Sequence, residues 1–324
     1  MSDLAEYARN IHEKESQIHK RELIPVKYES KTTKLTDIRA VIFDIYGTII
    51  NYWRPGFGDK QSRTDILAKD FLKLINRFGM EQTIREINPK ETPEKTLSEF
   101  YHGLIALNHQ KASEKGREFP EVKIEEIWSV ILMILKRRGY EFKEYFEGSQ
   151  TDFARYLAFT YNFYALGRQL YPGVVEALEE LKSQNVALGI LSNAQFYTPM
   201  DLTLMIRDQS KGKYDDFLEL FDVDLTFFSY EYGIAKPDQL LYRRLYDALY
   251  EYHILPSQTV VVGNDLLLDI KPAEEIGMHT AFFCGDSSVA FMHDLYGEVI
   301  PDISFSSWEE LPLKVSFHSQ ESGS

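Results

Sequence analysis

The chain has 324 residues, which is enough for about two domains and a sizeable hydrophobic core. Hydrophobic residues make up 44% and aromatic residues 14% of the chain, as is typical of a folded globule. Lysine and arginine number 36 against 50 aspartates and glutamates, so the net charge is −14 at pH 7. A surface this acidic repels polyanions. It argues against nucleic acid and anionic membranes as partners and leaves room for a small anionic substrate in a local basic pocket.

A single cysteine, Cys284, excludes an intramolecular disulfide and a thiolate metal cluster. It lies in the apolar stretch TAFFCG, which is typical of a buried, unreactive thiol. No apolar run approaches the roughly 20 residues that span a bilayer, and the charged start of the chain lacks the pattern of a secretion signal. We therefore expect a cytoplasmic protein, and the oligomeric state is left open, a homodimer included.

The N-terminal part predicts a helix followed by a linker. Residues 3–22 carry mixed charges with a weak helical period, and PVKYESKTTKLTD follows, so residues 1–37 are expected to form a helical extension and linker. Residues 38–43 are β-branched and apolar on both faces, as in a parallel strand covered by helices. Four later segments have the same character: 186–192, 223–229, 259–264 and 279–285.

Helical patterns separate most of these segments, which predicts an α/β fold with a doubly wound, mostly parallel sheet. Residues 53–168 are mostly helical in pattern and too long for a loop inside a compact domain. We expect an inserted all-helical domain there, with the α/β domain formed by 38–52 and 169–315. Aromatic residues between 153 and 164 recur at helical spacing, which favours helix core over a substrate pocket. The polar tail 316–324 is expected to be disordered.

Polar residues follow four of the predicted strands, and the ends of parallel strands converge on one crevice. These residues are Asp44, Ser192 with Asn193, Lys236, and Asp265 with Asp269. A carboxylate can attack an electrophile and form a covalent intermediate that water then opens. A divalent cation held by the acidic residues would bridge to an anionic substrate, while the lysine and the serine bind the transferring group. Each residue also has a structural alternative: Asp44, Ser192 or Asp265 can cap a turn or helix, and Lys236 can be a solvated turn residue.

Together, FDIYGT, LSNA, GIAKPD and GNDLLLDIKPAEEIGM resemble the four ordered motifs of the haloacid dehalogenase-like hydrolase superfamily. The resemblance spans residues 38–285, and the helical insert falls where that superfamily places its cap domain over a Rossmann-like core. It implies that Asp44 is the nucleophile and that Ser192 and Lys236 bind the transferring group. The implied ligands of Mg²⁺ are Asp44, Asp265, Asp269 and the carbonyl of Tyr46.

The resemblance also suggests residues around the substrate. Thr48 would brace the loop after the first motif, and Asn193 accompanies Ser192 in the second motif. Arg54, just after the first motif, has two readings: a contact to a substrate carboxylate or phosphate, or a surface charge near the domain hinge.

Tyr46 decides between two chemistries. Phosphatases of this superfamily usually have a second aspartate at this position, and a phenol with an ordinary pKa near about 10 is a poor replacement as an acid–base group. The 2-haloacid dehalogenases of the superfamily have a similar Asp-x-Tyr-Gly-Thr pattern, and a departing halide needs no proton. Those enzymes work without metal, however, and lack acidic residues with the spacing of Asp265 and Asp269.

The sequence thus favours a Mg²⁺-dependent phosphohydrolase acting on a small phosphorylated metabolite. A metal-independent 2-haloacid dehalogenase is the main alternative, and a catalytically weak member that acts as a binding protein is the second.

Overall fold

The computed structural model describes residues 3–15, 22–51, 60–165 and 169–316, which form two compact units. The α/β unit comprises Lys20–Tyr52, Arg168–Ala194 and Thr198–Ser324. The helical unit comprises Met1–His19, Trp53–Gly167 and Gln195–Tyr197. The helical unit thus combines the N-terminal segment, residues 53–167 and three residues that follow a strand of the sheet. Arg54 and the tail beyond residue 316 lie outside the described residues.

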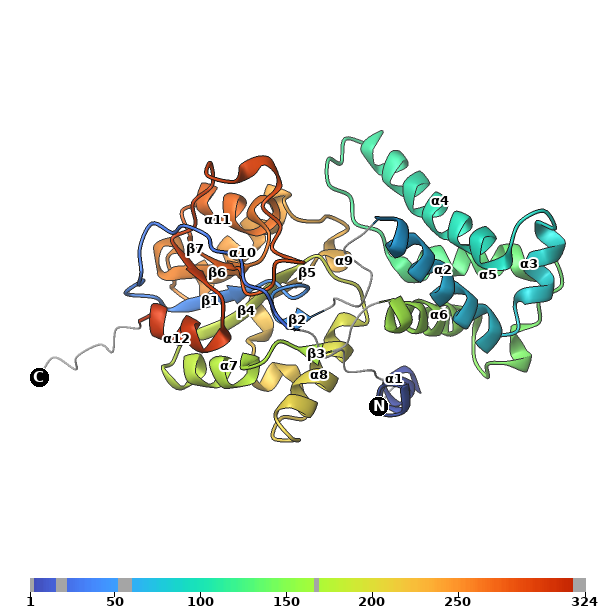
Figure 1. Cartoon of the computed structure of the whole chain (residues 1–324), viewed down its shortest axis with the longest axis horizontal. Helices are drawn as coiled ribbons and strands as arrows, with labels where there is room; N and C mark the ends of the chain where they lie inside the picture. Colours follow the sequence, from blue (N-terminus) through green and yellow to red (C-terminus); the bar gives the residue numbers. More distant parts are fainter. Residues whose placement is uncertain (1–2, 16–21, 52–59, 166–168, 317–324) are drawn as a thin grey trace, which may run out of the picture. The chain divides into compact units, whose positions relative to one another are not determined.

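The α/β unit is built on a six-stranded parallel sheet in the order β5-β4-β1-β6-β7-β8 (Figure 1). Its strands are β1 (Ala40–Phe43), β4 (Ala187–Ser192), β5 (Thr226–Phe228), β6 (Thr259–Gly263), β7 (His279–Phe283) and β8 (Ile303–Phe305). Strand β1 pairs with β4 on one side and with β6 on the other. The carboxyl ends of these three neighbouring strands therefore lie together at one edge of the sheet.

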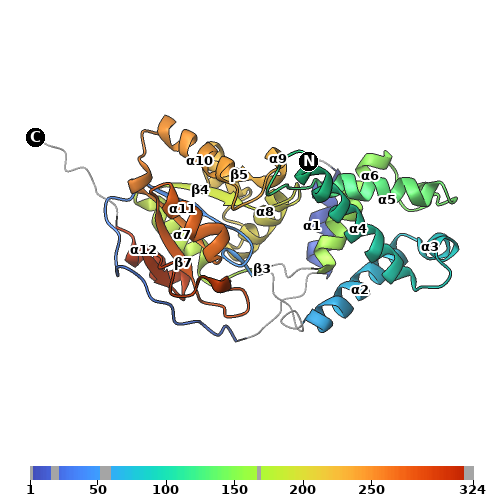
Figure 2. The same ribbon diagram turned by 90° about the horizontal axis from the view of Figure 1, so that it is seen from above.

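Helices cover both faces of the sheet (Figures 1 and 2). They are α7 (Val174–Ser183), α8 (Thr198–Gln209), α9 (Ser229–Tyr232), α10 (Gln239–Glu251), α11 (Lys271–Glu275) and α12 (Leu311–Lys314). Because successive side chains of a strand point to opposite faces, Val41 and Phe43 join a core with α7 and α8, whereas Ala40 and Ile42 join a core with α10. The predicted doubly wound α/β fold is confirmed.

Three features of the sheet were not anticipated. The edge strand β8 spans only Ile303–Phe305, too short to show a periodic pattern. A second sheet pairs β2 (Ile50–Asn51) with β3 (Gln169–Leu170) in antiparallel orientation. Strand β5 is shorter than the predicted 223–229, because residues Val223–Leu225 form a 3₁₀ turn before it.

The segment expected to be a linker is bound to the α/β unit. The backbone N–H of Val26 donates to the carbonyl of Cys284, and that of Leu35 donates to the carbonyl of Lys314, both over 2.8 Å. Tyr28 is buried and donates its hydroxyl to the carbonyl of Val299. Residues 22–37 therefore form a strap along the side of the sheet on which β8 is the edge strand.

The helical unit contains α1 (Asp3–Glu15), α2 (Lys60–Arg77), α3 (Glu81–Ile87), α4 (Pro93–Ser113), α5 (Ile124–Lys136) and α6 (Gln150–Ala165). Helix α1 is packed rather than solvated: Ala8 and Ile11 are buried, and the hydroxyl of Tyr7 lies 2.8 Å from that of Thr160 in α6. The aromatic residues of α6 are mostly core, as expected, and Phe159 is fully buried. None of the helices in the described ranges is long and apolar enough to cross a membrane.

Candidate active site

Asp44 lies directly after β1 at the carboxyl edge of the sheet, and its carboxylate is buried. One carboxylate oxygen, Oδ1, accepts hydrogen bonds from Ser192 Oγ at 3.0 Å and from Lys236 Nζ at 2.6 Å. The other oxygen, Oδ2, is 3.2 Å from Thr48 Oγ1. The backbone N–H of Asp44 donates to the carbonyl of Val262 in β6, which fixes the residue between two strands. The ends of β1 and β4 thus bring a carboxylate and a hydroxyl into contact.

Lys236 is buried between two carboxylates. Its ammonium lies 2.6 Å from Asp44 Oδ1 and 2.5 Å from Asp269 Oδ1. Burial acts to lower the pKa of Lys236, but Asp269 and Asp44 outweigh it and raise the pKa above the ordinary lysine value. Burial raises the pKa of Asp269 to about 7; Lys236 opposes this rise, and Asp44 adds to it. Two carboxylates share one ammonium, so the cluster carries an excess of negative charge when all three groups are ionised.

The side chain of Asn193 binds the main chain of Lys236. Its Oδ1 accepts from the backbone N–H of Lys236 at 2.7 Å, and its Nδ2 donates to the carbonyl of Lys236 at 3.2 Å. The side-chain amide therefore pairs with both polar groups of one main-chain residue. Asn193 was expected among the substrate-binding residues, and its hydrogen bonds give it a role in placing the Lys236 ammonium.

Asn264 occupies the position beside Asp44 that was expected for Asp265. Its Oδ1 lies 2.9 Å from Thr48 Oγ1, and its Nδ2 donates to the carbonyl of Val289. Thr48 has one hydroxyl proton and two acceptors, Asn264 Oδ1 and Asp44 Oδ2, of which the amide oxygen is nearer. Asp44 Oδ2 is therefore only weakly engaged by protein donors among the described contacts.

Asp265 is the N-cap of a π-helical turn, η5 (Leu266–Ile270). Its Oδ1 accepts from the backbone N–H groups of Leu267 and Leu268 at 2.8 and 2.9 Å. His293 Nε2 lies 2.9 and 3.0 Å from the two carboxylate oxygens. The helix-cap alternative considered from the sequence therefore describes Asp265, and the remaining oxygen of Asp269, Oδ2, accepts from the Asp265 N–H.

The expected ligand set of three carboxylates is thus not assembled. Within the part of the chain that the structure describes, no three side chains of His, Cys, Asp or Glu lie where they could hold a metal ion. The residues nevertheless suit a cation in a different way, because Asp44 Oδ2 and Asn264 Oδ1 flank Thr48 and the cluster has excess negative charge when Asp44, Asp269 and Lys236 are all ionised. Mg²⁺ commonly takes one or two protein carboxylates and completes its shell with waters and substrate phosphate oxygens. This donor set fits such an ion with Asn264, rather than Asp265, beside Asp44.

Tyr46 follows Asp44 in a tight loop. Its hydroxyl lies 2.9 Å from Thr198 Oγ1 at the start of α8. Gly47 has φ of +89°, a conformation that glycine adopts without strain, and its N–H donates to the carbonyl of Ile50 at 2.8 Å. The loop thus turns back sharply, and the phenol is held by a hydroxyl partner.

Two supporting residues were missed by the sequence analysis. Tyr242 of α10 is fully buried and donates its hydroxyl to the carbonyl of Leu268 in η5 at 2.6 Å. Burial, with the charges of Asp269 and Asp44, raises the pKa of Tyr242 well above its ordinary value, so it stays a donor. Gly263 is needed for close packing, since a Cβ there would lie 2.3 Å from Asp269 Cγ. Tyr242 showed only the helical periodicity of a core residue, whereas Gly263 is marked by its position at a strand end.

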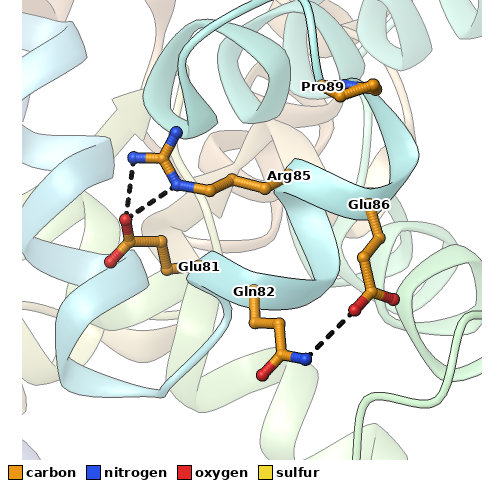
Figure 3. A pocket seen from close by; sticks show the side chains of 5 residues that line it. All are labelled: Glu81, Gln82, Arg85, Glu86 and Pro89. Carbon is orange, nitrogen blue, oxygen red and sulfur yellow. Dashed lines mark hydrogen bonds and ion pairs between the residues drawn. The ribbon is translucent and has the colours of Figure 1, made fainter.

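A surface pocket lies elsewhere, on α3 of the helical unit (Figure 3). It encloses about 680 Å³ and is lined by Glu81, Gln82, Arg85, Glu86 and Pro89. Arg85 is paired with Glu81, and Gln82 donates to Glu86, so the lining is acidic and internally bonded. Such a surface does not suit an anionic substrate.

Comparison with known proteins identifies the family. A family model described as haloacid dehalogenase-like hydrolase matches residues 38–277, most of the chain. The protein therefore belongs to the haloacid dehalogenase-like hydrolases, the family that the motifs resemble.

The curated relatives match a shorter segment. The chain is 30% identical over 114 residues to ribulose-1,5-bisphosphate 5-phosphatase of Halopiger xanaduensis, covering 35% of this chain and 42% of the relative. It is 30% identical over 110 residues to glyceraldehyde 3-phosphate phosphatase of Methanocaldococcus jannaschii, covering 34% and 42%. The chain thus spans about two fifths of the length of the curated relatives that it matches.

Solved structures of both enzyme classes are similar to the chain. A 2-haloacid dehalogenase from Pseudomonas syringae pv. Tomato aligns with a TM-score of 0.47 at 19% identity, covering 85% of this chain and 97% of that one. A HAD phosphatase from Thermococcus onnurineus aligns with a TM-score of 0.44 at 17% identity, covering 85% and 96%.

Proposed function

We propose that the protein is a Mg²⁺-dependent phosphohydrolase that acts on a small phosphorylated metabolite through a covalent intermediate on Asp44. The observation that carries this proposal is the buried Asp44 carboxylate, oriented by Ser192 Oγ and paired with Lys236 Nζ. The hydroxyl and the ammonium fix the orientation of the carboxylate, and an oriented carboxylate is a competent nucleophile. The names of the curated relatives, which are phosphatases of small phosphorylated sugars, support phosphate as the transferred group.

The reaction has two displacements at phosphorus. A carboxylate oxygen of Asp44 attacks the phosphorus atom, and the bond between phosphorus and the leaving oxygen breaks, with the electron pair departing on that oxygen. Water then attacks the phosphorus of the acyl phosphate, which releases orthophosphate and restores the Asp44 carboxylate. Lys236 and Ser192 stabilise the negative charge on the transferring oxygens. A Mg²⁺ ion held by Asp44, Asn264 and the Tyr46 carbonyl would supply further charge neutralisation.

The site restricts which leaving groups can depart rapidly. Residue 46 is a tyrosine whose phenol contacts Thr198, so no carboxylic acid stands there to protonate a departing alkoxide. General acid help of this kind is typically worth ~10²–10⁴-fold in rate. We infer that acyl and aryl phosphates, whose leaving groups are weakly basic, are hydrolysed faster than alkyl phosphates.

A 2-haloacid dehalogenase is the second candidate, favoured by two positions that carry no acid, Tyr46 and Asn264. Halide departs without a proton, and the ester formed on Asp44 would be opened by water at the carboxyl carbon. The two chemistries differ in where solvent oxygen arrives. In one turnover in ¹⁸O-labelled water, phosphoryl transfer labels orthophosphate, whereas dehalogenation labels the Asp44 carboxyl.

The direct test is a screen of phosphate monoesters, acyl phosphates and 2-haloacids, each with Mg²⁺ and with a chelator. We expect phosphatase activity that a chelator abolishes and that Asp44→Asn removes without loss of fold. Asp247→Asn, an exposed aspartate on α10, is the matched control and should retain activity. Chelator-resistant release of halide would favour the dehalogenase, and full phosphatase activity in Asp44→Asn would refute the assignment of the nucleophile.

A further inference from the structure

The chain crosses between the two units just after the second motif. Ala194 belongs to the α/β unit, Gln195–Tyr197 belongs to the helical unit, and Thr198 belongs to the α/β unit again. The crossing begins three residues after Ser192, which bonds the carboxylate of Asp44. Three peptide linkages therefore join this segment of the helical unit to Ser192, the residue that bonds the candidate nucleophile.

Gln195 is anchored through every polar atom of its side chain. Its Oε1 accepts from the backbone N–H of Ile124 at 3.1 Å, and its Nε2 donates to the carbonyl of Val122 at 2.9 Å and to Glu121 Oε1 at 3.1 Å. Helix α5 begins at Ile124, and the preceding residue, Lys123, provides no side-chain cap. Because the first N–H groups of a helix lack partners within it, Gln195 supplies a cap for α5 from a distant part of the sequence.

The two residues after Gln195 strengthen this anchor. The guanidinium of Arg155 lies 4.7 Å from the centre of the Phe196 ring, and the Tyr197 ring packs against Phe159 of α6. Both Phe196 and Tyr197 are buried. The whole segment Gln195–Tyr197 is thus held by the helical unit and is not a free loop.

Residues 192–194 connect this anchored segment to the candidate active site. Ser192 bonds Asp44, Asn193 holds the main chain of Lys236, and Ala194 accepts and donates hydrogen bonds with Ser229 Oγ. Each of four consecutive residues, 192 to 195, therefore fixes a different partner. A displacement at Gln195 reaches Ser192 over three peptide linkages.

We propose that Gln195 is a positioning residue that keeps Ser192 and Asn193 in register with Asp44 and Lys236. It does so by fixing the chain to the start of α5 immediately after the second motif. The inference rests on the proposed function for its catalytic readout only, because the anchoring itself is measurable without turnover.

The catalytic test uses Gln195→Met, which keeps the length of the side chain and removes the three hydrogen bonds to Glu121, Val122 and Ile124. Gln110→Met is the matched control, since Gln110 is exposed on α4 and its side chain donates to Glu114 of the same surface. A misplacement of about 1 Å at a catalytic group can cost on the order of 10²-fold in rate. We expect kcat for an acyl phosphate to fall by about 10-fold or more in Gln195→Met, with a smaller change in KM and none in the control.

A double-mutant cycle with Ser192→Ala separates positioning from a general loss of structure. If Gln195 acts through Ser192, Gln195→Met has little further effect once Ser192→Ala is present. A purely structural defect would lower kcat by the same factor in both backgrounds. Should Gln195→Met fail to fold, Gln195→Glu retains the acceptor for the Ile124 N–H, loses the donors, and is expected to lower kcat in the same way.

Hydrogen exchange of the peptide covering residues 192–198 measures the anchor independently of activity. We expect faster exchange in Gln195→Met and wild-type exchange in Gln110→Met. Unchanged exchange overturns the proposal, as does wild-type kcat in a folded Gln195→Met protein that hydrolyses phosphate esters. Absence of phosphatase turnover in the wild-type protein would instead refute the proposed function, and the exchange result would still decide the role of Gln195.

Discussion

Replacing Lys236 by methionine tests the electrostatics of the site most severely. Methionine keeps much of the apolar stem and removes the ammonium that lies 2.6 Å from Asp44 and 2.5 Å from Asp269. The lysine and Asp269 side chains are each 2% exposed, so water cannot replace the lost cation. Removing one partner of a buried ion pair typically costs about 3–5 kcal/mol, because the other charge is left buried and uncompensated. Here two carboxylates are left, so we expect a loss in the upper part of that range.

Such a loss lowers the unfolding temperature of the α/β unit by roughly 10 °C or more. Thermal and urea unfolding of Lys236→Met against the wild-type protein measure it. Lys95→Met is the control. It removes an exposed lysine of α4 that pairs with Glu91, just before that helix, and it should change stability little. A stability of Lys236→Met equal to that of the control would refute the charge arrangement described for the site.

The loss should also depend on pH. Burial already raises the pKa of Asp269 to about 7, and removal of the ammonium, which opposes this rise, raises the pKa of Asp269 further. A carboxyl group whose pKa is higher in the folded than in the unfolded state stabilises the fold at low pH. It loses that contribution as pH rises through the folded pKa. The stability difference between Lys236→Met and wild type should therefore shrink as pH falls from about 7 to about 5, whereas a constant difference would contradict this reasoning.

Four further substitutions probe other parts of the structure. Tyr242→Phe leaves the half-buried carbonyl of Leu268 without its hydroxyl donor and should cost about 1 kcal/mol in urea unfolding; no loss would argue against its support of η5. Tyr46→Asp supplies a carboxylic acid and should raise the hydrolysis of alkyl phosphates by about 10²-fold or more, and an unchanged rate would remove the stated reason for the leaving-group preference. Asn264→Asp adds a carboxylate beside Asp44 and should lower the Mg²⁺ concentration needed for half-maximal activity, whereas an unchanged requirement would exclude residue 264 as a ligand. Ala8→Asp places a charge in the buried contact of α1 and should make the N-terminus more sensitive to limited proteolysis than in the wild-type protein, whereas equal sensitivity would argue against the packing of α1.

The sheet could be predicted because its inner strands have a strong local signal. Strands β1, β4, β6 and β7 are buried on both faces, so their sequences are continuous apolar runs. Strand β8 has three residues, and its place at the edge depends on pairing with β7, which no local pattern records. The strap of residues 22–37 was missed for the same reason, since its hydrogen bonds reach residues far away in the sequence.

Within the site, the strand-end rule brought Asp44, Ser192 and Lys236 together, but it could not choose between two adjacent polar residues after β6. Neighbouring side chains of an extended segment point in opposite directions, so either Asn264 or Asp265 was able to face Asp44. Because the N–H groups of η5 and His293 attract the charged side chain, Asp265 takes the cap and the amide of Asn264 meets Thr48. Contacts that are so distant in sequence are visible only in the folded chain.

The central claim is that Asp44 carries the phosphoryl group during turnover. An acyl phosphate formed during steady-state hydrolysis can be reduced with borohydride and located by mass spectrometry of peptides. We predict that residue 44 is converted to homoserine when a phosphate substrate and Mg²⁺ are both present, and that neither Asp265 nor Asp269 is modified. Active turnover of a phosphate ester with Asp44 unmodified, or with the label on another residue, would contradict the account.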